Sequence, residues 1–185
     1  NVDGFEFDHG RIRTQGNLDG LQVGNLLRLA EAFTGEAPPA RSDLVLDGRW
    51  NVTLAETAAG FAELRRRSGD VSVNAGRGFT TLGLGESALR ADLAGNRINL
   101  RGGIEAARLG KLTVDASAGL LQEQGLMTVT PASALAGRVT ADIPRLKTLE
   151  ALSGPQYAFE GRLGAVLRLA GTVGKPLLTG NIDGE

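Results

Sequence analysis

Hydrophobic and polar residues alternate with a period of two along much of this 185-residue chain. From Leu44 to Leu54 the even-numbered positions are leucine, glycine, tryptophan or valine, and most odd-numbered positions are polar. Because successive side chains of a strand point to opposite faces of a sheet, this pattern predicts a long strand with one apolar face. Residues 162–169 alternate in the same way, with leucine or alanine at each odd-numbered position.

Shorter alternating runs recur between these two segments and are separated by turn residues. The clearest turn signals are Ser68-Gly69-Asp70, Ala94-Gly95-Asn96, Gly102-Gly103 and Leu109-Gly110-Lys111. Glycine is frequent, at 27 of 185 residues, which fits many turns and bulges. The spacing predicts a mostly β protein, an antiparallel meander of roughly a dozen strands.

Two segments follow helical spacing instead. Apolar residues at intervals of three and four predict a helix over 23–34, ended by Gly35. A second helix is predicted over 144–153, ended by Gly154-Pro155.

The two predicted helices are similar to each other and indicate an internal repeat. The sequence LRLAEAFTG (27–35) aligns with LKTLEALSG (146–154), so repeat units begin near residues 21 and 143. Repeats of this size favour one continuous, elongated β segment over residues 1–185. The chain starts at Asn1 without a methionine or signal sequence, and we expect it to be a piece of a longer protein.

Composition narrows the possible functions. The chain has no cysteine, one histidine and a net charge of −1. Disulfides and thiolate metal sites are therefore excluded, and no basic stripe indicates a nucleic-acid partner. The longest run without a charged residue is 14 residues, 124–137, which is shorter than the roughly 20 apolar residues of a membrane-spanning helix.

Two glycine-rich stretches invite a nucleotide-binding interpretation. Gly171-Thr172-Val173-Gly174-Lys175 would need a glycine where Leu169 stands and a serine or threonine where Pro176 stands. Gly83 to Ala88 matches a loose dinucleotide fingerprint, but an alternating strand pattern follows it where a helix is required. Both stretches are predicted to be turns or hairpins.

Other catalytic signals are weak. His9 has no serine in a nucleophile-elbow motif to act on, and the carboxylates do not form a convincing acid–base pair. We therefore expect no enzyme, no metal site and no cofactor.

The second half of the chain resembles a known family. Residues 141–184 read ADIPRLKTLEALSGPQYAFEGRLGAVLRLAGTVGKPLLTGNIDG, with a Leu-rich helix, a Gly-Arg strand and an LxGTxGxPxLTGxI step. Residues 42–73 read SDLVLDGRWNVTLAETAAGFAELRRRSGDVSV, a tryptophan-bearing strand followed by RRxSGD. Both resemble repeat elements of the TamB family, the translocation and assembly module subunits within the AsmA-like, bridge-like lipid transfer group.

The resemblance implies an internal periplasmic piece of a Gram-negative protein that is anchored in the inner membrane. Its sheet would curl into an open trough, or β-taco, with an apolar interior. The whole protein would bridge to the outer membrane and act with a TamA-type Omp85 partner through parts outside this chain. The implied roles are phospholipid transport and support of outer-membrane protein assembly, with acyl chains or nascent barrel strands as cargo.

The alternating pattern and the resemblance together predict which residues line a lipid groove. Two other β architectures also have alternating strands. A membrane barrel requires aromatic girdles that this chain lacks, whereas a structural solenoid or adhesin-like module has a closed apolar core. The expected groove-lining residues are the following: Leu44, Leu46, Trp50, Val52, Leu54, Val71, Val73, Leu89, Leu93, Ile98, Leu100, Leu112, Val114, Val139, Ile143, Phe159, Leu163, Leu167, Leu169, Val173, Leu178 and Ile182.

Overall fold

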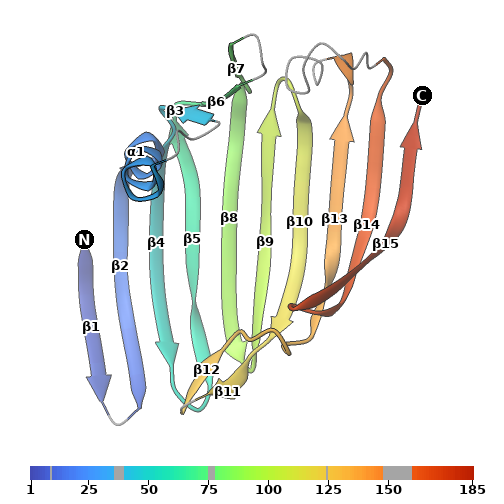
Figure 1. Cartoon of the computed structure of the whole chain (residues 1–185). Coiled ribbons are helices and arrows are strands. Elements are labelled where there is room, and N and C mark those ends of the chain that lie inside the picture. Colours follow the sequence, from blue (N-terminus) through green and yellow to red (C-terminus); the bar gives the residue numbers. More distant parts are fainter. Residues whose placement is uncertain (9, 36–39, 75–77, 124, 148–159) are drawn as a thin grey trace.

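The computed structural model describes residues 1–8, 10–35, 40–74, 78–123, 125–147 and 160–185. Ten antiparallel strands form one open sheet in which each strand pairs with the next in the order β1-β2-β4-β5-β8-β9-β10-β13-β14-β15 (Figure 1). The strands of this sheet are β1 Val2–Asp8, β2 Arg11–Gln22, β4 Val45–Leu54, β5 Ala58–Ser68, β8 Leu84–Gly95, β9 Arg97–Ala106, β10 Gly110–Gly119, β13 Leu135–Ile143, β14 Leu163–Thr172 and β15 Lys175–Gly184. The prediction of a mostly β, antiparallel meander is confirmed.

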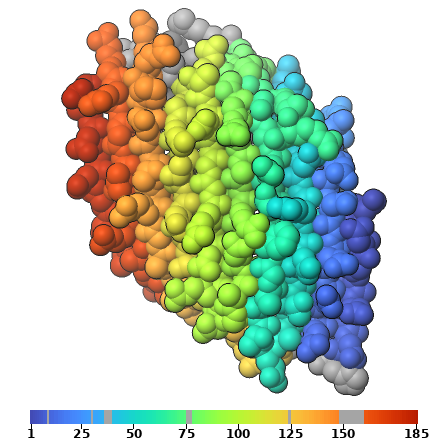
Figure 2. Space-filling model, turned by 180° about the vertical axis from the view of Figure 1, so that it is seen from behind, coloured from blue at the N-terminus to red at the C-terminus, as the bar shows by residue number. Residues whose placement is uncertain are grey.

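Two small sheets lie at the ends of the long strands. One contains β3 Ala40–Ser42, β6 Val71–Asn74 and β7 Phe79–Thr81, and the other is the hairpin of β11 Leu121–Glu123 and β12 Leu126–Thr128. Seen from behind, the ten long strands form one continuous surface that follows the chain from blue to red (Figure 2).

The predicted first helix is confirmed. Helix α1 spans Val23–Thr34, and Gly35 ends it in the left-handed conformation, with φ of 71°. The Gly35 N–H donates a hydrogen bond to the Glu31 carbonyl at 2.8 Å, which satisfies one of the helix's last acceptors. The second predicted helix, 144–153, falls largely outside the described residues, so the internal repeat stays a prediction.

Cross-strand pairing gives the ten-stranded sheet two chemically different faces. Directly paired residues of antiparallel strands point to the same side, so a face can be followed from strand to strand. One such row runs from Leu64 through Leu89, Gly102, Val114 and Val139. We call the side that carries this row the apolar face, and its other rows are also built almost entirely of leucine, isoleucine, valine, alanine and glycine.

The opposite side, which we call the polar face, carries a ladder of charged side chains. Glu63 on β5 lies 2.8 Å from Arg49 on β4 and 3.2 Å from Arg90 on β8. Both arginines also approach the ring of Phe61, with guanidinium-to-centroid distances of 5.5 and 4.7 Å. These contacts link three neighbouring strands on the side turned away from the apolar face.

The glycine motifs of the sequence are parts of strands and turns. Thr172 pairs with Lys175, so Val173-Gly174 is the two-residue loop of the β14–β15 hairpin, and the Lys175 N–H donates to Thr172 Oγ1 at 3.2 Å. Gly83 to Ala88 spans the irregular start of β8, which pairs with β9. The nucleotide-binding interpretation is wrong for both stretches, because neither leads into a helix.

One predicted turn is wrong. Gly102-Gly103 lies inside β9, whereas Ser68-Gly69-Asp70, Gly95-Asn96 and the residues before Gly110 connect strands as predicted. A Cβ atom on Gly102 would lie 2.7 Å from Leu89 Cδ1, so this glycine is required by a close neighbour.

Candidate functional site

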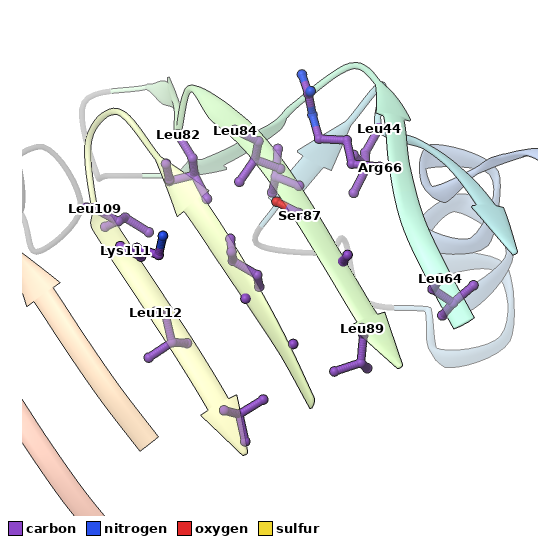
Figure 3. Close-up of a pocket in the computed structure, with 18 of the residues that line it drawn as sticks. Leu44, Leu64, Arg66, Leu82, Leu84, Ser87, Leu89, Leu109, Lys111 and Leu112 are labelled. Carbon is purple, nitrogen blue, oxygen red and sulfur yellow. The ribbon is translucent and has the colours of Figure 1, made fainter. Parts of the chain in front are cut away.

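The apolar face contains an open cavity near the end of the sheet at which the β9–β10 turn lies. The cavity has a volume of about 610 Å³, within the range of ~300–1,000 Å³ typical of ligand pockets. Its walls come from β4, β5, β8, β9, β10 and β13, with Leu44, Val71, Leu82 and Leu109 at the strand ends (Figure 3). The lining is almost entirely apolar.

The large side chains of this cavity are unusually exposed for apolar residues. Leu64 is 40% exposed, Leu89 39%, Ile104 47% and Leu112 45%. They come from four consecutive strands of the sheet, and Leu64 pairs with Leu89 while Ile104 pairs with Leu112. Because contiguous exposed apolar surface is costly in water, such a patch indicates a site for an apolar ligand or partner.

Glycines make room for these leucines within the plane of the face. A Cβ on Gly48 would lie 2.8 Å from Leu64 Cδ2, as one on Gly102 would lie 2.7 Å from Leu89 Cδ1. Each leucine therefore leans over a neighbouring strand that offers no side chain. The leucine side chains therefore lie close to the sheet, and the space above the apolar face stays open.

The other end of the apolar face is covered. The segment that contains β11 and β12 folds over it, and Leu120 and Met127 pack with Ala58, with exposed fractions of 5%, 8% and 1%. Hydrogen bonds hold the segment to the β14–β15 hairpin: the Gly174 N–H donates to the Pro131 carbonyl at 2.8 Å. Within the segment, the Thr130 N–H donates a hydrogen bond to Oγ of the buried Ser133 at 3.0 Å.

Polar side chains are few at the cavity. Ser87 lies on β8 and Lys111 at the start of β10. Lys111 Nζ is 2.7 Å from Glu105 Oε1, and this hydrogen bond raises the pKa of Lys111 above its usual value. The other two polar residues of the lining, Arg65 and Arg66, lie at the end of β5, and Arg66 donates from Nε to the Gly69 carbonyl at 3.0 Å.

The structure distributes the predicted groove-lining residues over several environments. Seven of them line the cavity: Leu44, Leu46, Val71, Leu89, Leu112, Val114 and Ile143. Nine others share the apolar face but lie outside the cavity: Trp50, Val52, Leu100, Val139, Leu163, Leu167, Leu169, Leu178 and Ile182.

Five of the remaining six predicted residues are not part of an open surface of the main sheet. Leu54, Leu93 and Ile98 pack against the core of the covered end. Val73 belongs to β6 of a small sheet, and Val173 lies in the β14–β15 turn. Phe159 lies outside the described residues.

Several cavity residues were missed by the sequence pattern. Leu64 follows the small residues Ala58, Gly60 and Ala62, which hide the period of two, although all four share the apolar face. Ile104 continues the alternation of β9 beyond Gly102-Gly103, a pair whose composition predicts a turn. A pattern that counts glycine and alanine as apolar strand positions would have found both residues.

The fold and this face define a class of protein: an open antiparallel sheet with one apolar and one polar side and a cavity on the apolar side. A family model described as TamB, N-terminal domain, matches residues 25–183, from α1 to the end of β15. The chain therefore belongs to the TamB family, whose members are associated with the cell envelope. No curated protein and no solved structure matches the chain at a significant level.

Within the part of the chain that the structure describes, no helix has the length and apolar character needed to cross a membrane.

Proposed function

We propose that this chain is a periplasmic section of a bridging protein and that its apolar face shields phospholipid acyl chains during transport between the two membranes. The observation that supports this proposal is the apolar face itself, with its cavity and its row of half-exposed leucines. The open sheet would act as a trough: tails lie along the apolar face, and headgroups stay in water. Each residue of the lining only has to exclude water, so the proposal involves no catalysis and no cofactor.

The energetics of acyl chains explain why such a face would be useful. Exposing a methylene group to water costs about 0.8 kcal/mol, so a sixteen-carbon chain in water costs on the order of 12 kcal/mol. A continuous apolar face removes most of this barrier without a deep binding site that would trap the lipid. Leucine, valine and alanine provide such a lining, because they offer apolar contact without specific polar bonds.

The wider role in the envelope is part of the same proposal. The parent protein would be anchored in the inner membrane and would act with a TamA-type Omp85 protein through parts outside this chain. Support of outer-membrane protein assembly is compatible with the same face, since nascent barrel strands also present apolar side chains.

The covered end of the sheet favours a second candidate function, a structural β module with a closed core. There Leu120 and Met127 fill the apolar face much as a solenoid core would be filled. This candidate predicts that the cavity at the open end binds no lipid.

Site-specific photo-crosslinking distinguishes the two candidates. A photoreactive amino acid is placed at Leu89 or Leu112, and the matched controls are Arg90 and Thr113, the next residues along the same strands but on the polar face. After irradiation of cells that express the protein, crosslinked lipids are identified by mass spectrometry. Labelling at Leu89 and Leu112 but not at the controls supports the lipid proposal. Equal labelling of both faces, or none on either, contradicts it.

A further inference from the structure

Arg66 is the only charged residue that cross-strand pairing within the described sheet places on the apolar face. It pairs with Leu46 on β4. Its two neighbours in sequence point to the other side and are paired with carboxylates: Arg65 lies 3.5 Å from Glu63 and Arg67 lies 2.8 Å from Asp47. The run of three arginines is therefore divided between the faces, and only the middle one is turned toward the apolar side.

The hydrogen bonding of Arg66 leaves most of its guanidinium uncommitted. Nε donates to the Gly69 carbonyl, and among the described residues no carboxylate forms an ion pair with Arg66. A guanidinium carries five N–H donors in a planar fork that fits the oxygens of a phosphate or carboxylate. A half-buried cation beside apolar walls carries a desolvation cost that an anionic ligand would offset.

The position of Arg66 relative to the cavity suggests which ligand this would be. Figure 3 shows Arg66 beside Leu44 at one end of the apolar side chains, with its guanidinium pointing away from them. A molecule bound to both parts would need an apolar tail for the leucines and an anionic group at one end. Free phosphate would gain nothing from the apolar walls, whereas a phospholipid has both parts.

We propose that Arg66 binds the phosphate of a phospholipid whose acyl chain occupies the cavity lined by Leu64, Leu89 and Leu112. This inference rests on the proposed function and adds a headgroup contact to it. This arginine would select for a phosphate without closing the face, so that a bound lipid can still move along the sheet. The arginine would also orient the lipid, with its headgroup at the strand ends and its tail over the leucines.

The test compares probes that share a tail and differ in the head. Palmitoyl lysophosphatidylglycerol carries a phosphate, monopalmitoylglycerol carries none, and palmitate carries a carboxylate. Binding of each probe is measured by isothermal titration calorimetry below its critical micelle concentration, for the wild-type chain and for Arg66→Gln, Arg66→Lys and Arg67→Gln. Arg67→Gln is the matched control, because it removes the same charge from the next residue, which pairs with Asp47 and does not line the cavity.

We expect the wild type to bind the phosphate probe about tenfold more tightly than monopalmitoylglycerol, the effect of one good charge-assisted contact. Arg66→Gln should abolish this preference and leave monopalmitoylglycerol binding unchanged, Arg66→Lys should retain part of it, and Arg67→Gln should retain all of it. Because each variant is judged by the ratio between two probes, a variant that fails to fold is recognised by loss of monopalmitoylglycerol binding. Arg66→Lys then decides the question.

Other outcomes overturn the inference in distinguishable ways. If no probe binds the wild type, the proposed function fails together with the inference. If palmitoyl lysophosphatidylglycerol and monopalmitoylglycerol bind equally and Arg66→Gln changes neither affinity, the proposal that the apolar face binds lipid is retained. The proposed headgroup site at Arg66 is then refuted. Palmitate binding as tight and as dependent on Arg66 as the phosphate probe, or competition by millimolar inorganic phosphate without any tail, would refute the phospholipid assignment.

Discussion

The two ends of the apolar face are built from the same kinds of residue but differ in what lies above them. At one end Leu64, Leu89 and Leu112 are about two-fifths exposed around an open cavity. At the other, Leu120 and Met127 cover the sheet and create a buried core with Ala58. The strands themselves do not differ: the same β5, β8 and β9 run through both ends.

Among the residues that the structure describes, one connection accounts for the covered end. Between β10 and β13 the chain makes the β11–β12 hairpin, which returns over the apolar face before the sheet resumes. At the cavity end the β9–β10 connection is only three residues long, between Ala106 and Gly110, and does not cover the face. An amphipathic sheet can thus be a core at one end and an accessible surface at the other, depending on where its connections fold.

The largest expected effect comes from truncating a leucine at each end. Leu120→Ala at the covered end should lower the free energy of unfolding by about 2–5 kcal/mol, because it leaves a cavity in a closed core. Leu112→Ala should cost only about 1 kcal/mol, since nearly half of this side chain is already in water. Urea denaturation followed by circular dichroism measures both values. Similar losses at the two positions would show that the ends are equally packed.

An intermediate effect is expected where a glycine supports the open end. Gly102→Ala places a Cβ 2.6 Å from the Ala88 carbonyl oxygen and 2.7 Å from Leu89 Cδ1, and we expect a loss of about 1–3 kcal/mol from the forced displacement. Gly164→Ala is the control, because a Cβ there meets no atom within 4 Å. The control should be neutral or slightly stabilising, since alanine restricts the unfolded chain. If the thermal midpoints of the two variants agree, Leu89 does not depend on the glycine beneath it.

The smallest effect concerns the polar face, which, unlike the apolar face, does not differ between the two ends of the sheet. The hydrogen bond from Arg49, together with the charges of Arg65 and Arg90, holds the pKa of Glu63 below its usual value of 4.5. The ionised carboxylate therefore stabilises the fold above this value, and the contribution is lost as the pH falls through the lowered pKa. Glu63→Gln should show a shallower loss of stability in acid than the wild type, as measured by urea midpoints at successive pH values.

A matched control for this prediction is Glu6→Gln, because Glu6 forms no ion pair with any residue that the structure describes. The control should follow the wild-type acid dependence. A Glu63→Gln profile identical to that of the wild type would show that the ladder of Arg49, Glu63 and Arg90 does not contribute to stability.

Much of the fold could be predicted because the period of two is visible in the residues themselves. Leu46 to Leu54 and Leu163 to Leu169 alternate so clearly that each side chain was placed on the correct face before any pairing was known. The pattern was less informative where small residues replace large ones. In Ala58-Ala59-Gly60 both faces carry small side chains, and Gly102-Gly103 has the same composition as a turn.

The candidate site was only partly predictable for a related reason. Leu93 and Leu89 lie on one strand with the same alternation, yet Leu93 packs against the core of the covered end while Leu89 lines the cavity. Which of them is covered depends on where residues 120–134 fold, a contact between segments far apart in the chain. Arg66 likewise lies in a run of three arginines that look alike in the sequence. Its pairing with Leu46 shows that Arg66 is on the apolar face, unlike Arg65 and Arg67.

The sequence by itself determined the local properties of this protein: the strands, helix α1 and the two chemically different faces, because each depends on side chains a few residues apart. The tertiary structure decided which stretch of the apolar face stays open, because that depends on which distant segment folds over it. It also decided that Arg66 lies at the cavity, because the pairing of β5 with β4 sets Arg66 opposite Leu46, in register with the other apolar-face positions of β5.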